Sequence, residues 1–153
     1  MVAVEIEVFC RQRPDRLLVC RLAGWVMRTV MDVEQGDAVV AEDDEHVWLA
    51  RWGTSVSAQV VELPPGDYEF ADRWSLTFAP GERGVDPSKL FAVVLADAAA
   101  VLCDGFLRDE IGLVGGGQRA AGDLSRVLLR RAPTSESTAS SVLKDMTERS
   151  SAD

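Results

Sequence analysis

The spacing of strand-like segments between residues 36 and 80 constrains the fold more than any other feature of this sequence. Short runs rich in β-branched and aromatic residues follow one another there. The expected strands are 38–42, 46–52 and 56–63, followed by the alternating stretch 68–78 that ends before Pro80-Gly81. Turn-forming residues separate them, among them Asp43-Asp44 and the run Pro64-Pro65-Gly66-Asp67. Such short connections join antiparallel strands, because parallel pairs need a crossover of a dozen or more residues.

The first 32 residues predict a β-α-β opening. Residues 2–10 alternate apolar and other side chains, which is typical of a half-buried strand. Pro14 suits the first turn of a helix over 14–23, in which Leu18, Leu22 and Trp25 have the spacing of a buried stripe. Gly24 is positioned to end this helix, and 25–32, rich in β-forming residues, predicts a second strand.

A helix over 86–103 is the best-defined expected element. Asp86 suits its N-cap, Pro87 its first helical position and Asp104-Gly105 its end. The face predicted to pack on the sheet carries Leu90, Phe91, Val94, Leu95, Ala98, Val101 and Leu102. The opposite face carries Val93, Ala96 and Ala100 beside Lys89, Asp97 and Cys103. Small side chains on an outer face permit a close neighbour, so we expect Val93, Ala96 and Ala100 at the contact of a homodimer.

The chain of 153 residues favours one main domain. We expect an α+β domain over 1–117, in which a single mostly antiparallel β-sheet is packed by two helices. A short C-terminal helix is expected at 118–131. Residues 132–153 contain nine Ser or Thr and few large apolar side chains, which predicts a flexible tail.

The run Gly115-Gly116-Gly117-Gln118-Arg119-Ala120 fits the G-x-G-x-x-A pattern of dinucleotide-binding loops. That motif opens a unit with a second parallel strand and an acidic residue about twenty positions further on. Only 36 residues follow Gly117, no credible strand lies among them, and Glu136 falls in the Ser/Thr-rich tail. The glycines are therefore interpreted as a joint, and no cofactor is expected.

Negative charge is concentrated in one window of the chain. The net charge is −9, and residues 31–50 contain seven Asp or Glu and no Lys or Arg. Glu42, Asp43, Asp44 and Glu45 form an expected acidic tip at a turn. This charge disfavours nucleic acid and anionic membranes, because binding to phosphates depends on cationic side chains. The acidic residues from Asp32 onward do not match the spacing of a calcium loop, so no metal is expected.

Cysteine usage and the N-terminus indicate a cytoplasmic protein. Cys10, Cys20 and Cys103 are odd in number and too sparse for a disulfide framework. Glu5 and Glu7 interrupt the only apolar stretch near the start, unlike a secretory signal. The longest apolar run, 90–96, is also too short to span a membrane.

His46 is the single histidine, and it shares one face of its expected strand with Trp48 and Trp52. The neighbouring acids would raise the pKa of His46 and suit it to act as a general acid. Catalysis by one histidine also needs a positioned partner, which no motif supplies. A small enzyme or ligand-binding domain using His46 and the Trp48/Trp52 face is therefore an alternative, not the leading hypothesis.

The leading hypothesis is a non-enzymatic cytosolic protein-binding module. An acidic inhibitor of the immunity-protein kind, which blocks a basic partner protein, would use such a surface directly. Its expected contacts are Glu42, Asp43, Asp44, Glu45, Trp48 and Trp52. The likeness to those inhibitors is in size and charge only. A secretion chaperone or adaptor, which shares this size and acidity, is a second alternative within the binding class.

Overall fold

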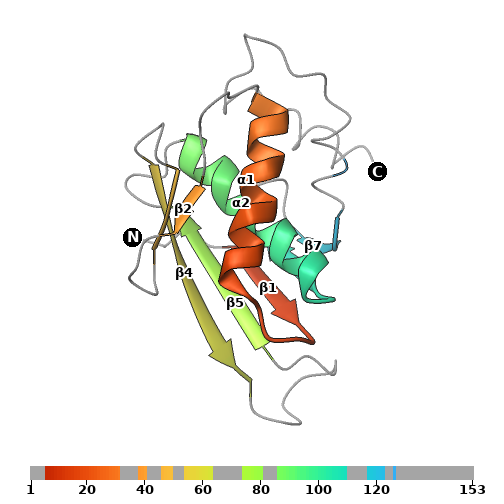
Figure 1. Cartoon of the computed structure of the whole chain (residues 1–153). Coiled ribbons are helices and arrows are strands. Elements are labelled where there is room, and N and C mark those ends of the chain that lie inside the picture. Colours follow the sequence, from red (N-terminus) through yellow and green to blue (C-terminus); the bar gives the residue numbers. More distant parts are fainter. Residues whose placement is uncertain are drawn as a thin grey trace.

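Seven strands and two helices make up the part of the chain that the computed structural model describes. Figure 1 shows how these elements are arranged. The described residues are 6–31, 38–40, 46–49, 54–63, 74–80, 86–109, 117–122 and 126. The elements are β1 (Ile6–Cys10), α1 (Arg16–Met31), β2 (Ala38–Val40), β3 (His46–Leu49), β4 (Thr54–Glu62), β5 (Trp74–Pro80), α2 (Asp86–Leu102), β6 (Phe106–Asp109) and β7 (Gly117–Ala120).

All described strands belong to one sheet in the order β2-β3-β4-β5-β1-β6-β7, and every pairing between them is antiparallel. The predicted α+β class with an antiparallel sheet and two packing helices is therefore confirmed. β1 lies inside the sheet between β5 and β6, where Val8 faces Leu76 on one side and Leu107 on the other. All three of these side chains are buried, so the sheet's centre is also the centre of the core.

Helix α1 begins two residues later than expected, at Arg16, and is longer, since it ends at Met31. Asp15 is its N-cap, because Oδ1 of Asp15 accepts the N–H groups of Leu17 at 3.0 Å and Leu18 at 3.3 Å. The helix continues through Gly24 to Met31, so the strand predicted at 25–32 is wrong for all its described residues. Gly24 is buried within the helix and has no positive φ, hence it does not act as a helix end.

The buried face of α1 also differs from the predicted one. Val19, Cys20, Ala23 and Val26 are buried, whereas Leu18 is 48% exposed and Trp25 50% exposed. The buried positions keep the three- and four-residue spacing of a helix across Gly24. This continuous face packs against α2 and outweighs the β preference of the residues after Gly24.

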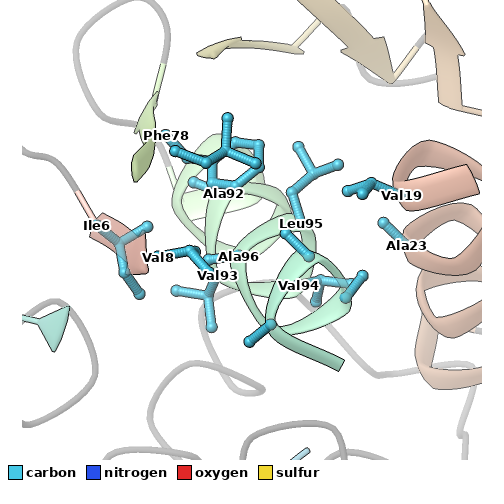
Figure 2. Close-up of a cluster of buried hydrophobic side chains, with 14 of the residues drawn as sticks. Ile6, Val8, Val19, Ala23, Phe78, Ala92, Val93, Val94, Leu95 and Ala96 are labelled. Atoms are coloured by element: carbon cyan, nitrogen blue, oxygen red, sulfur yellow. The ribbon is translucent and has the colours of Figure 1, made fainter. Parts of the chain in front are cut away.

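Helix α2 is covered on two sides, as Figure 2 shows. Its residues from Leu90 to Ala100 are all buried. Val93 and Ala96 lie on the side of Ile6 and Val8 of β1, and Val94 and Leu95 lie toward Val19 and Ala23 of α1. A helix that is apolar all round is typical of such a doubly covered position.

This arrangement corrects the expected orientation of α2. The face with small side chains lies against the sheet, while Val101 and Leu102, predicted to be buried, are exposed. Val93, Ala96 and Ala100 are fully buried within the chain, so they do not form the outer face that the homodimer contact required. Alanines bring the helix backbone close to the strands, which explains their position.

The end of α2 is a Schellman motif. Asp104 takes the left-handed conformation with φ of 51°, and the N–H of Gly105 donates to the carbonyl of Ala100 at 2.9 Å. The carbonyl of Cys103 accepts the N–H groups of Arg11 at 3.2 Å and Gln12 at 3.3 Å. These bonds fasten the end of α2 to the segment that follows β1.

The C-terminal helix expected at 118–131 does not begin at 118. Gly117–Ala120 is strand β7, which pairs with β6 from Phe106↔Ala120 to Asp109↔Gly117. Gly117 therefore starts a strand and does not lead into a helix. Arg126 is helical, and its N–H donates to the carbonyl of Gly122 at 2.9 Å. Gly115, Gly116 and the predicted tail at 132–153 lie outside the described residues.

Candidate functional site

Of the predicted contact residues, only Trp48 lies in a described segment, and its backbone belongs to β3. Glu42, Asp43, Asp44, Glu45 and Trp52 fall outside the described residues. The backbone of β3 is described, with His46 opposite Ser57 of β4 and Trp48 opposite Ser55. β2 is the terminal strand of the order, and Val40 at its end is opposite Val47. The acidic residues thus connect the last two strands at this end.

A cleft of about 430 Å³ lies between α1 and strands β4 and β5. Its volume falls within the range of small-molecule sites, roughly 300–1,000 Å³. The residues that line it are Arg13, Pro14, Arg16, Val19, Cys20, Ala58, Gln59, Val60, Leu76, Phe78 and Leu95. They come from the start of α1, both strands and one position of α2.

Unequal strand lengths explain why the cleft lies here. β3 pairs with β4 only over Thr54–Ser57, whereas β5 pairs with β4 as far as Glu62. Beyond Ser57, β4 has no second neighbour among the described strands. Val60 pairs with the buried Leu76, yet it is 47% exposed. Among the described residues, nothing covers the inner face of the sheet beside the start of α1.

Two arginines mark the mouth of the cleft. The guanidinium carbon of Arg13 lies 5.6 Å from the ring centroid of Trp74, which is a cation–π distance. Arg16 is partly buried in the first turn of α1. Asp15 stands between them in sequence, but its carboxylate caps α1, and no acidic residue is among the described lining residues. Arg13 and Arg16 are therefore the charged side chains among the described lining residues.

Cys20 contributes a neutral group to the cleft. Burial raises the pKa of its thiol to about 11, and the positive charge of Arg16 lowers the pKa by a smaller amount. The thiol is therefore protonated at neutral pH, and Cys20 is unsuited to act as a nucleophile, which requires the thiolate. Its role in the cleft is that of a small, uncharged side chain.

Cys10 and Cys103 meet at the other end of α2. Burial raises the pKa of Cys103, and a hydrogen bond with the Cys10 side chain lowers it by less. All three cysteines are free and buried. Cys10 and Cys103 are therefore core thiols, and neither presents a reactive surface sulfur.

Within the described residues, no group of three or more His, Cys, Asp or Glu side chains is arranged to hold a metal ion. Neither described helix combines the length and hydrophobicity needed to cross a membrane.

Sequence reasoning missed the cleft because it assigned the wrong face of α1 to the core. Arg13 and Arg16 flank the helix cap, and this pattern is visible in the sequence. Their position beside β4 depends on the rotation of α1, which the Leu18, Leu22 and Trp25 spacing predicted incorrectly. Comparisons of the chain with protein-family models, curated proteins and solved structures find no match, so no relative's activity is available for transfer to this site.

Proposed function

We propose that this chain is a non-enzymatic cytosolic protein-binding module that captures a basic partner through its acidic segment, as an immunity-type inhibitor does. The observation that carries this proposal is the charge distribution. Residues 31–50 hold seven Asp or Glu and no Lys or Arg, in a chain whose net charge is −9. A single window thus contains most of the charge imbalance.

The position of the flanking strands supports a role in docking. β2 and β3, which border Glu42–Glu45, are the last two strands at one end of the sheet. α1 packs against β2, so the same end of the molecule also includes helix surface. A partner that meets this end would contact strand and helix together without entering the core.

Electrostatics favours such a segment as a recognition element. Concentrated charge attracts an oppositely charged protein over a Debye length of about 8 Å at physiological ionic strength and speeds association. It also disfavours partners of the same sign, which gives specificity. Mutual repulsion between carboxylates about 6 Å apart in water is under about 1 kcal/mol per pair, so the cluster costs the fold little.

Exposed apolar side chains on α1 favour protein binding in addition to charge attraction. Leu17 is 58% exposed, and Leu18 and Trp25 are exposed to about half their surface. Leu18, Leu22 and Trp25 follow one side of the helix at the spacing of successive turns. Large apolar residues beside charged ones are the usual contacts of protein interfaces. The three free cysteines are consistent with the reducing cytosol.

The experiment uses the full chain, tagged, as bait in lysate from its own cells, with captured proteins identified by mass spectrometry. One variant carries Asp43→Lys and Asp44→Lys. The matched control carries Glu62→Lys and Asp104→Lys, two exposed acids elsewhere on the chain. Each replacement changes the charge by +2, so both variants move from −9 to −5.

We expect a basic protein to be captured by the wild type and the control but not by the Asp43→Lys, Asp44→Lys variant. The affinity of the wild-type chain for the purified partner, measured by calorimetry, should fall as the salt concentration increases. Equal capture by both variants, or an affinity independent of salt, would refute the proposal. Circular dichroism of each variant establishes that the fold is intact.

A further inference from the structure

We propose that the cleft between α1, β4 and β5 binds a small molecule that carries a carboxylate on an apolar body. This inference does not depend on the proposed partner binding, because it concerns other residues on another part of the chain. It assigns Arg13 and Arg16 to the anionic group and the side chains behind them to the apolar part.

The walls of the cleft fit an apolar body. Ala58 and Val60 of β4 pair with Phe78 and Leu76 of β5, so these four side chains form a continuous patch on the sheet. The other walls come from Val19 of α1 and Leu95 of α2, and the latter is fully buried. A volume of about 430 Å³ accommodates a chain of roughly ten carbons, within the size range of ligand sites.

The mouth fits a carboxylate. Arg13 and Arg16 both line the cleft, and the guanidinium group binds carboxylates through charge-assisted hydrogen bonds. Trp74 lies under the Arg13 guanidinium at 5.6 Å and helps to hold it at the mouth. Arg11 and Arg21 lie nearby in sequence but do not line the cleft, so the cationic character belongs to particular positions.

The interior does not oppose an anion. Cys20 stays protonated at neutral pH because burial raises its pKa to about 11. Gln59, the other polar residue among the described lining residues apart from the arginines, pairs with Thr77, so its side chain lies on the sheet face opposite Ala58 and Val60. An anion with an apolar tail therefore meets opposite charge at the mouth and uncharged surface inside.

The test is isothermal titration of the full chain with sodium decanoate below its micellar concentration. Decyltrimethylammonium, which has the same tail and the opposite charge, is the matched ligand. We expect saturable 1:1 binding of decanoate, at least about tenfold tighter than the cation. No saturable binding, or equal affinity for both ligands, would overturn the proposal.

Two double arginine variants test where the carboxylate of the ligand binds. Arg13→Gln with Arg16→Gln should weaken decanoate binding about tenfold or more, while Arg11→Gln with Arg21→Gln removes the same charge and should change it less than about twofold. An equal loss in both pairs would overturn the assignment, since it would indicate attraction by overall charge.

A third variant tests the place of the tail. Ala58→Phe fills the cleft from β4, so we expect it to abolish binding while thermal unfolding stays cooperative. Amide NMR shifts induced by decanoate in the wild type should concentrate at Cys20, Gln59 and Val60. Shifts at the exposed apolar residues of α1 instead, such as Leu18, would contradict the cleft and identify a surface association.

Discussion

Asp97 is the buried ionisable side chain of α2, and its bonding explains its position in the core. Its exposed fraction is 0%, and Oδ1 accepts the N–H of Gly122 at 3.0 Å. This bond fastens the residues after β7 to the side of α2. Sequence reasoning placed Asp97 on an outer face with Val93, because the C-terminal segment gave no signal that it would return to this helix.

We expect Asp97→Ala to lower the free energy of unfolding by about 1–3 kcal/mol, because it leaves the N–H of Gly122 without its acceptor. Asp97→Asn should cost less, since its side-chain oxygen still accepts. Urea denaturation measures both. Asp104→Asn is the control, because it removes only a surface ion pair with Arg11 at 3.6 Å and keeps a residue type that tolerates the φ of 51°. An Asp97→Ala variant as stable as the control would contradict this role.

Gly105 is required by a close approach of two backbones. A Cβ at this position would collide with the carbonyl oxygen of Phe9 in β1. We expect Gly105→Ala to destabilise the protein by more than about 3 kcal/mol, because backbone atoms have to move. Gly122→Ala should cost only about 1 kcal/mol, because its φ of +88° is unfavourable for alanine. The added Cβ itself has room, since its nearest contact would be Val101 at 3.8 Å. Thermal unfolding that ranks Gly122→Ala as the more damaging change would contradict this contact.

The raised pKa of the Cys20 thiol predicts that the protein loses stability at alkaline pH. Its pKa is about 11 in the folded protein against 9.0 for the ordinary group. The folded state therefore binds the thiol proton more tightly than the unfolded state does. The resulting contribution to the free energy of unfolding is complete below pH 9 and is lost as pH rises from 9 to 11. We expect the unfolding free energy of the wild type to fall over this interval by on the order of 2 kcal/mol more than that of Cys20→Ala. Parallel urea–pH curves for the two proteins would contradict the shift.

At the scale of elements, the sequence predicts α2 and the strands β1 to β5 well, but it misses β7 and predicts a strand where α1 continues. The end signals of α2, Asp86 and Asp104-Gly105, are local, and local signals are visible in a sequence. α1 contains Gly24 and many β-forming residues, and its continuity depends on burial of Val19, Ala23 and Val26 against α2. That contact joins residues far apart in the chain, so local preference gave the wrong boundary.

The orientation of α1 about its own axis predicts that Val26 contributes more to stability than Leu18. Val26 is buried and Leu18 is half exposed. We expect Val26→Ala to cost about 1–3 kcal/mol and Leu18→Ala less than about 1 kcal/mol, although the leucine loses more carbon atoms. Chemical denaturation of the two variants measures the difference. A larger loss of stability for Leu18→Ala would contradict this orientation and favour the buried face of Leu18, Leu22 and Trp25 that the sequence predicts.

The cleft is a site that cannot be found by predicting each helix and strand separately. Its β4 and β5 residues fall in segments expected to be strands, and Arg13 and Arg16 stand at an expected helix start. Its existence depends on where β3 ends along β4 and on which face of α1 turns inward. Both are properties of packing between elements, and the individual segments do not encode them separately.

At the scale of the molecule, the acidic segment and the arginine-lined cleft adjoin different strands of the sheet. The acidic segment connects β2 and β3 at one end of the strand order, whereas Arg13 and Arg16 line a cleft beside β4 and β5. The distribution of charge along the chain, visible in the sequence, predicts the first of these. The second requires the three-dimensional arrangement, because the chain as a whole is acidic.

Hydrogen–deuterium exchange of the full chain, with and without the captured basic protein, tests partner binding most directly. The proposal predicts slower exchange on binding in peptides covering 38–49, which include β2 and β3. Peptides covering β6 and β7, at the other end of the sheet, should be unchanged. Protection confined to β6 and β7, with unchanged exchange in 38–49, would contradict the account.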